Sequence, residues 1–367
     1  MWLLLLACQT PPSRVVIVGM DGLEYSLLDR MIEQGELPAF RAMMTDGARG
    51  ELQIPAPVMS PIVWTTLATG YPPEVHGIGG WTHGDHFSNA SDVRAERLWE
   101  VASASQQKVL VSGWLLSWPA APVSGQLITD RYIWSAPLDS GAQMNEEEGL
   151  SFTTFPSKLS EELGTLRPDA DWLLAQPIGY QVRRWGPLAH PLRRDETQVR
   201  IWEKYWQDQQ LSAIYLNGAD QISHLYWPFV EPSTAARIRR EPEARQEAVA
   251  RAAGSRRVIP FADGLDAAAW EEAARTVPDY YRYLDGVLAR VMAKITPETT
   301  LILCSDHGFS ISTREPLTVG SHRPVGVFLA RGPGIRPGKV GALELVDFAP
   351  TIYALLGLPA AADMPGK

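Results

Sequence analysis

Short apolar segments recur along this chain of 367 residues, and stretches with helical periodicity separate them. Each segment is apolar at successive positions, which is typical of a strand buried on both faces of a sheet. Strands that alternate with helices are joined by crossovers, and crossovers make neighbouring strands parallel. The sequence therefore predicts an α/β fold whose mostly parallel central sheet has helices on both faces. The expected strands are residues 14–19, 108–113, 211–216, 300–304 and 326–330.

Four further segments have the pattern of helices that turn one apolar face toward a sheet. One opens with the acidic Glu24, and two stop at a glycine, Gly47 or Gly357, which suits the C-terminal cap of a helix. The expected helices are residues 23–34, 37–46, 280–295 and 347–356.

Two segments break this alternation. Residues from about 80 to 200 are loop-rich, with scattered prolines and tryptophans, which predicts an insertion over one edge of the sheet. Residues from about 229 to 275 include a run of mixed charges, typical of a solvated helical excursion. We therefore expect one α/β domain over residues 14–367, interrupted by these two insertions.

Residues 1–13 form a hydrophobic leader whose Leu5-Leu6-Ala7-Cys8 stretch is similar to the cleavage box of bacterial lipoproteins. In such a box the cysteine becomes the lipidated first residue of the mature protein. We expect lipidation at Cys8, attachment to a membrane by this anchor, and a location in the cell envelope, periplasmic or at the surface. A stray hydrophobic leader or a start codon assigned too late is the alternative, because the apolar segment is short and no Lys or Arg precedes it.

Charge and cysteine content exclude several classes of protein. The chain has 33 Lys and Arg against 42 Asp and Glu, a net charge of −9. Proteins that wrap nucleic acid need a basic surface, so that class is excluded. Two cysteines, Cys8 and Cys304, are too few for a disulfide framework or a cysteine-rich zinc module. Cys304 lies in a predicted strand, where we expect a core residue.

Aspartates and histidines gather where the predicted strands end. Each of them alone has an ordinary structural explanation as a turn, cap or loop residue. The carboxyl ends of parallel strands meet at one edge of a sheet, however, so these side chains are expected to lie together. Carboxylate oxygens and imidazole nitrogens are the ligands of catalytic zinc, and sometimes of manganese or iron. The six residues are Asp21, Asp220, His224, Asp306, His307 and His322.

A candidate nucleophile, Ser60, stands after a proline-containing approach and before a predicted helix. The N-terminus of a helix favours an anion such as phosphate, because its backbone N–H groups are unpaired and its dipole is positive there. A plain N-cap serine is the alternative interpretation of this residue.

The order of these motifs along the chain resembles that of the alkaline phosphatase superfamily. The resemblance is strongest to the type I phosphodiesterase/nucleotide pyrophosphatase branch. The resemblance rests on Asp21 within 20–22, on Ser60 with 64–70 and 76–78, on the later Asp and His motifs, and on the closing helix. It covers the chain from about residue 14 to its C-terminus. It implies two divalent metal ions, with zinc expected. Asp21, Asp306 and His307 would hold the metal that also touches Ser60, and Asp220, His224 and His322 would hold the other.

The resemblance also implies a chemistry. Two cations about 4 Å apart clamp the attacking and the leaving oxygen of an in-line displacement. Coordination of a serine hydroxyl lowers its pKa and makes it a better nucleophile. The expected reaction is hydrolysis of a small-molecule phosphate ester through a phosphorylated Ser60, and no separate general base or protein partner is identified.

Departures from the family's motifs narrow the range of expected substrates. Nucleotide pyrophosphatases carry an asparagine three residues after the nucleophile, where this chain has Val63. No arginine for phosphoryl oxygens is identified either. Fewer polar contacts suit a diester better than a monoester, so we expect a phosphodiesterase. Sulfatases carry a Cys-x-Pro-x-Arg type box that residues 60–64 do not match, which excludes a sulfatase.

Two alternatives stay open from the sequence. One is an envelope phosphotransferase or phosphomonoesterase of the same superfamily. The other is a metal-binding surface protein whose catalysis has lapsed, although Ser60 and all six candidate ligands are present.

Overall fold

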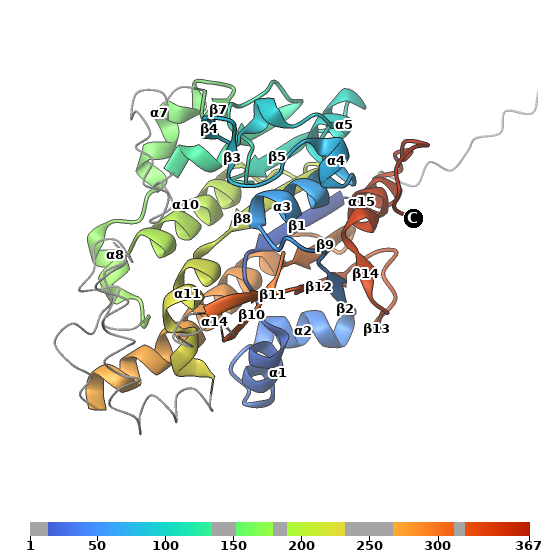
Figure 1. The fold of residues 1–367 in the computed structure, drawn as a ribbon. Helices are drawn as coiled ribbons and strands as arrows, with labels where there is room; N and C mark the ends of the chain where they lie inside the picture. Colours follow the sequence, from blue (N-terminus) through green and yellow to red (C-terminus); the bar gives the residue numbers. More distant parts are fainter. Residues whose placement is uncertain (1–13, 134–151, 179–188, 232–266, 312–319) are drawn as a thin grey trace, which may run out of the picture.

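The computed structural model describes residues 14–133, 152–178, 189–231, 267–311 and 320–367 (Figure 1). The leader with Cys8 and the mixed-charge run at 237–247 lie outside these described residues. No helix in the described ranges has the length and apolar character needed to cross a membrane.

A ten-stranded sheet forms the centre of the molecule, with the order β13-β2-β12-β9-β1-β8-β5-β6-β7 and β14 also paired to β2. Strands β9, β1, β8, β5 and β6 are parallel neighbours, whereas β12 is antiparallel to both β9 and β2. The predicted mostly parallel sheet is therefore confirmed. The strands are β1 Arg14–Met20, β2 Ala48–Gln53, β5 Val109–Ser112, β6 Gly125–Ile128, β7 Thr154–Phe155, β8 Leu211–Leu216, β9 Thr299–Cys304, β12 Val325–Arg331, β13 Gly338–Lys339 and β14 Leu343–Glu344.

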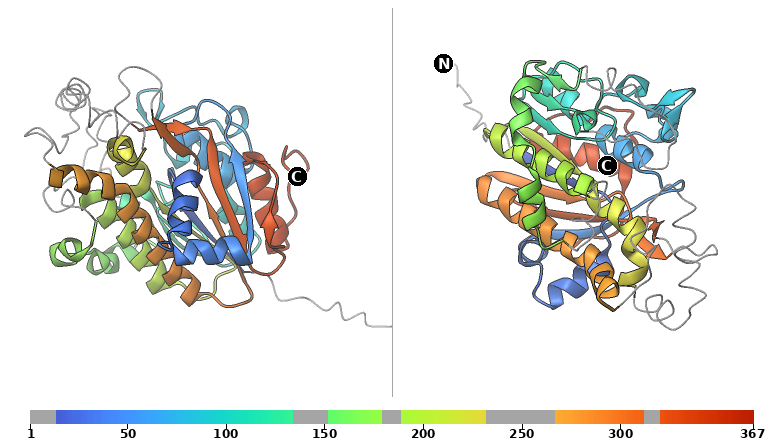
Figure 2. Two further views of the ribbon diagram at one scale, coloured as in Figure 1. Left: turned by 90° about the horizontal axis from the view of Figure 1, so that it is seen from below. Right: turned by 90° about the vertical axis from the view of Figure 1, so that its left-hand side faces the viewer.

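Helices cover both faces of this sheet (Figure 2). The longer helices are α1 Tyr25–Glu33, α2 Pro38–Asp46, α3 Ser60–Thr69, α5 Leu98–Ala104, α10 Ala189–Tyr205, α11 Gly218–Val230, α14 Ala267–Lys294 and α15 Phe348–Leu356. Shorter elements are α4 Pro73–His76, α7 Leu159–Leu163 and α8 Ala170–Ala175, with the hairpin strands β3 Thr82–His83, β4 His86–Phe87, β10 Gly308–Ile311 and β11 Gly320–Arg323. All four predicted helices are present, as α1, α2, the second half of α14, and α15.

The alternation of side chains in β1 shows why helices pack on both faces. Val16 and Val18 belong to a core shared with α1, α2, α10, α11 and α14. Val15 and Ile17 belong to a second core with α3, α5 and α15. Since neither face of the strand meets water beyond Arg14, its sequence is apolar from Val15 to Met20. Cys304 in β9 is fully buried, as expected.

Gly47 ends helix α2 for a different reason from the one predicted. Its φ of −131° is extended rather than left-handed. A Cβ atom at this position would lie 2.2 Å from the backbone oxygen of Ala330, so the close approach of β12 requires glycine here. Gly357, by contrast, caps α15 with a left-handed φ of 68°.

The described part of residues 80–200 is more regular than its sequence suggests. It supplies β5, β6 and β7 to the central sheet and contains most of the 17-residue helix α10, which ends at Tyr205. The helical period of α10 is weak in the sequence because several of its buried residues are polar. They include Asp195, Glu196, Thr197 and Gln198.

Candidate active site

The ends of three parallel strands and the start of one antiparallel strand meet at a single edge of the sheet. Asp21 directly follows β1, helix α11 begins just after β8, and Asp306 and His307 link β9 to β10. Strand β12 runs antiparallel to β9, so the hairpin strand β11 that precedes β12 arrives at the same edge. His322 lies in β11, opposite Phe309 of β10. The structure thus brings all six predicted residues to one place.

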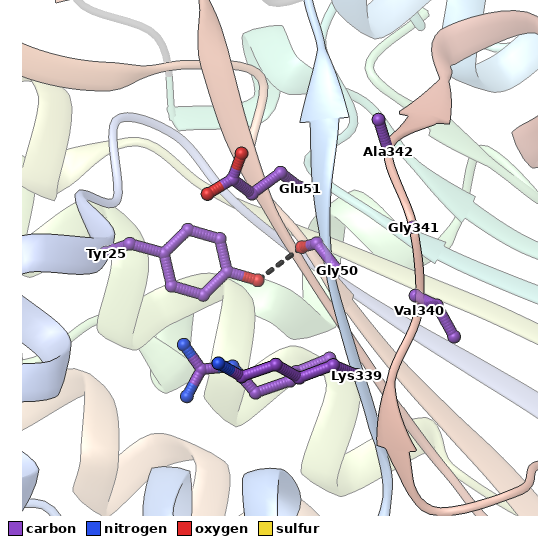
Figure 3. A pocket seen from close by; sticks show the side chains of 8 residues that line it. Tyr25, Gly50, Glu51, Lys339, Val340, Gly341 and Ala342 are labelled. Atoms are coloured by element: carbon purple, nitrogen blue, oxygen red, sulfur yellow. Dashed lines mark hydrogen bonds between the residues drawn. The ribbon is translucent and has the colours of Figure 1, made fainter.

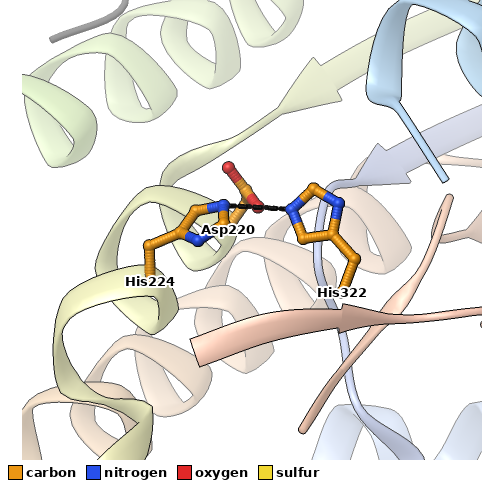
Figure 4. Close-up of side chains that lie close together, drawn as sticks. All are labelled: Asp220, His224 and His322. Carbon is orange, nitrogen blue, oxygen red and sulfur yellow. Dashed lines mark hydrogen bonds and ion pairs between the residues drawn. The ribbon is translucent and has the colours of Figure 1, made fainter. Parts of the chain in front are cut away.

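One group of side chains combines α11 with β11 (Figure 4). Asp220 and His224 are four residues apart on α11 and share one face, with His224 Nε2 3.2 Å from Asp220 Oδ1. His322 Nε2 lies 3.3 Å from the same oxygen and 3.0 Å from His224 Nε2. Three potential ligand atoms therefore point into one small space.

A second group is centred on His307. Its Nε2 lies 3.2 Å from Asp21 Oδ1, 3.5 Å from Asp306 Oδ2 and 3.6 Å from Asp220 Oδ1. Asp220 therefore stands between the two groups, and its Oδ1 is within reach of both. This residue would be available as a ligand to either cation of a two-metal centre.

All three histidines are oriented by a backbone carbonyl. A carbonyl oxygen only accepts hydrogen bonds, so each Nδ1 carries the proton and donates it. In the neutral imidazole each Nε2 then has a lone pair that faces the carboxylates, as in histidines that bind metals. The three bonds run from His224 to Gly320 O at 3.2 Å, from His307 to Gly308 O at 3.1 Å and from His322 to Val58 O at 3.2 Å.

Several buried polar atoms of this cluster have no hydrogen-bond partner among the described residues. A buried polar group without a partner costs about 1–3 kcal/mol, and such groups are rare in folded proteins. Four of them at one edge of the sheet match the ligand atoms of a cation. They are Asp21 Oδ1, Asp220 Oδ1, Asp306 Oδ2 and His307 Nε2.

The buried carboxylates of the cluster also require a positive charge nearby. Burial and the neighbouring carboxylate of Asp21 raise the pKa of Asp306 well above its usual value. Burial opposes a charge on His307, yet the carboxylates of Asp306 and Asp21 raise its pKa to about 10. Protons are held here because the buried carboxylates require compensation, and a divalent cation meets the same requirement.

Ser60 is the first residue of α3 and is almost fully buried. Met59, not Ser60, occupies the N-cap position, so the interpretation of Ser60 as a plain N-cap serine is wrong. The hydrogen bond between His322 and Val58 O holds the approach to α3 against the cluster. Trp64, one turn further along α3, donates from Nε1 to Asp21 Oδ2 at 3.1 Å. The start of α3 is therefore connected to the cluster on both sides of Ser60, through Val58 before it and through Trp64 after it.

Two further residues contact the cluster without being among those predicted from the sequence, Trp64 and Tyr215. The Tyr215 hydroxyl donates to Asp21 Oδ2 at 2.6 Å. A tyrosine in the buried strand β8, whose other residues are aliphatic except Ser212, is the local sign that its hydroxyl meets a polar partner.

A surface pocket lies elsewhere, beside β2 and the edge strand β13 (Figure 3). Tyr25 reaches into it and donates a hydrogen bond to Gly50 O. None of the seven candidate residues lines this pocket, so it is separate from the Asp and His cluster. The lining residues are Tyr25, Arg49, Gly50, Glu51, Lys339, Val340, Gly341 and Ala342.

Comparison with known proteins identifies a family and a fold. The family model described as type I phosphodiesterase / nucleotide pyrophosphatase matches residues 15–317. No curated protein sequence matches the chain.

Three solved structures resemble the chain at low sequence identity. Murine ectonucleotide pyrophosphatase / phosphodiesterase 5, in an inactive form with AMP, has a TM-score of 0.52 at 12% identity, covering 97% of both chains. The phosphonate monoester hydrolase of Silicibacter pomeroyi has a TM-score of 0.51 at 15% identity, covering 97% of this chain and 75% of the other. BT4656 in complex with its substrate D-glucosamine-2-N,6-O-disulfate has a TM-score of 0.52 at 12% identity, covering 97% and 79%. These likenesses establish the shared fold.

Proposed function

The chain belongs to the type I phosphodiesterase/nucleotide pyrophosphatase family, and from this premise we propose that it hydrolyses phosphodiesters at a two-metal centre through a Ser60 intermediate. Membership makes the chain a metal-dependent phosphoester hydrolase with the alkaline phosphatase-like fold. The two metals, the covalent serine route and the preference for diesters are our proposal beyond that.

The donor set fits divalent cations. Its four unpaired buried atoms and its inward-facing Nε2 atoms are the observation that carries this assignment. We assign Asp21, Asp306 and His307 to the metal beside Ser60. Asp220, His224 and His322 would hold the other metal, and Asp220 also faces the first group. Mixed imidazole and carboxylate ligands favour zinc. When bound, the metals supply the positive charge that an in-line displacement at phosphorus needs.

Ser60 is the proposed nucleophile because it opens α3 beside the cluster. Its Oγ forms a bond to phosphorus while the bond from phosphorus to the leaving oxygen breaks. The hydroxyl proton passes through solvent to that leaving oxygen. Water then attacks the phosphorus of this serine phosphodiester, which breaks its bond to the serine oxygen, releases a phosphate monoester and restores the serine hydroxyl. The unpaired N–H groups at the start of α3 favour the negative charge of the phosphoryl group during both steps.

Val63 supports a diester as the substrate. Its side chain is 1% exposed and belongs to the core on the α3 face of the sheet. This position therefore offers no polar contact to a phosphoryl oxygen, and a diester carries less charge there than a monoester.

The test compares the wild-type chain with Ser60→Ala on a chromogenic diester and on the matching monoester. We expect wild type to turn over the diester faster. Ser60→Ala should lose about 10³-fold or more of kcat while it keeps its zinc content, because the hydroxyl contributes chiefly to the chemical step. Ser223→Ala is the matched control, since it removes a buried hydroxyl that has no hydrogen-bond partner among the described residues.

Each part of the proposal has its own contrary result. Near wild-type turnover by Ser60→Ala would refute the covalent route, and a strong monoester preference would refute the substrate class. Full zinc content without turnover of either ester would support a metal-binding protein that has lost catalysis.

A further inference from the structure

The carboxylate of Asp21 is held asymmetrically. Its Oδ2 accepts two hydrogen bonds, at 2.6 Å from the Tyr215 hydroxyl and at 3.1 Å from Trp64 Nε1. Its Oδ1 has no hydrogen-bond partner among the described residues and lies 3.2 Å from His307 Nε2. Two donors on one oxygen fix the plane of the carboxylate and direct the other oxygen into the cluster.

Both donors are rigidly packed. Trp64 is fully buried, and its ring meets the ring of Tyr215 edge to face, with centroids 4.9 Å apart at 78°. Trp114 packs against the same indole at 5.2 Å and 90°. An indole N–H can only donate, so its direction toward Asp21 has no alternative in this packing.

The backbone of β1 is adapted to this indole. A Cβ atom at Gly19, two residues before Asp21, would lie 2.7 Å from the Trp64 ring. Glycine therefore lets the ring lie against the strand that delivers Asp21. This close fit suggests that Trp64 serves Asp21 and not only the general filling of the core.

Trp64 also connects two functional elements. It lies four residues after Ser60 on α3, so one turn of buried helix separates the proposed nucleophile from the group that holds Asp21. Tyr215 comes from β8, the strand that leads into the helix of Asp220 and His224.

We propose that Trp64 and Tyr215 are positioning residues that fix Asp21 as a ligand for the metal expected beside Ser60, and that Trp64 ties Asp21 to the helix that begins at Ser60. The inference rests on the proposed function. Partners in the outer shell of a metal site typically contribute about 10–100-fold to metal affinity or activity.

The experiment measures zinc affinity by competition with a chromophoric chelator, together with kcat and KM on a diester. Tyr215→Phe removes only the hydroxyl, and Trp64→Phe removes the indole N–H. We expect each variant to bind zinc about 10–100-fold more weakly at the site that includes Asp21. We also expect kcat to fall while KM stays close to that of wild type, with partial recovery of kcat in excess zinc.

Two controls separate positioning from packing. Tyr25→Phe also removes a buried tyrosine hydroxyl with a hydrogen bond, here to Gly50 O, away from the cluster. Trp202→Phe removes a buried indole N–H that donates to Ser212 Oγ at 2.8 Å and contacts neither Trp64 nor Asp21. Both controls should lower thermal stability and leave zinc affinity unchanged.

The outcomes distinguish this inference from the proposed function. A wild-type chain that binds no zinc overturns both. Zinc binding by wild type with unchanged affinity in folded Tyr215→Phe overturns the positioning role alone. If Trp64→Phe does not fold, Tyr215→Phe decides the matter, because the loss of one hydroxyl leaves the ring packing in place.

Discussion

Two fully buried histidines, His76 and His307, have opposite electrostatics. At the end of α4, His76 accepts a hydrogen bond at Nδ1 from the Ile78 N–H and pairs Nε2 with the Thr66 hydroxyl, each at 3.1 Å. Burial lowers its pKa to about 4. At the cluster, the carboxylates of Asp306 and Asp21 overcome the same burial and raise the pKa of His307 to about 10.

The difference teaches how to recognise a functional histidine in this fold. Both nitrogens of His76 have a partner, so the imidazole is neutral and structural. The Nε2 of His307 has no hydrogen-bond partner among the described residues and faces carboxylate oxygens that are also unpaired. Burial is equal in the two places, so the surrounding charge and the unpaired atoms identify the site.

The largest expected effect is on kcat, and it distinguishes His307 from His76. His307→Ala should lower kcat on a diester about 10³-fold or more and reduce the zinc content, because it removes a proposed ligand. His76→Gln should leave kcat of the folded fraction close to wild type. Steady-state kinetics with metal analysis measure both variants, and equal losses in the two would break the comparison.

Removal of metal should destabilise the chain by the next largest amount. Unpaired buried carboxylates lose their compensating charge when a chelator is added. A ligand at about 1,000 times its Kd stabilises the folded state by about 4 kcal/mol, and chelation removes this contribution. Thermal unfolding with and without chelator measures the change in Tm. His307→Ala should show a smaller change, whereas no change in wild type would contradict a metal centre.

Acid should destabilise the chain through His76 by a smaller amount. The folded pKa of about 4 lies below the unfolded value of 6.5, so the neutral form is favoured by folding. The contribution is therefore complete above pH 6.5 and is lost as the pH falls toward 4. The fall of the pKa from 6.5 to about 4 corresponds to a contribution on the order of 3 kcal/mol.

Urea unfolding at several pH values between 7 and about 4 checks this sign. The free energy of unfolding of wild type, minus that of His76→Gln, should decrease as the pH falls. A difference that stays constant would show that His76 is protonated as readily in the folded chain as in the unfolded one.

Much of the fold follows from the sequence because its strands are buried on both faces. Strand β8 begins and ends at the predicted residues 211 and 216. Strand β2 was not predicted, because it lies near the sheet edge and carries the polar Arg49, Glu51 and Gln53 at alternate positions. Hydrophobic patterning identifies central strands and overlooks polar ones near an edge.

The site was predictable to the extent that strand ends carry it. Asp21, Asp306 and His307 follow strands, and Asp220 and His224 share a helical face that their spacing indicates. The contacts of Trp64 and Tyr215 with Asp21 were not predictable, because they join residues 43 and 194 positions apart. Only the packed structure shows which carboxylate receives these donors.

The zinc content of the purified wild-type chain tests the central claim most directly. Metal analysis after dialysis against metal-free buffer should find about two zinc ions per chain, because the cluster offers two groups of ligands around Asp220. A content of one or none, in a chain shown to be folded, would contradict the two-metal centre.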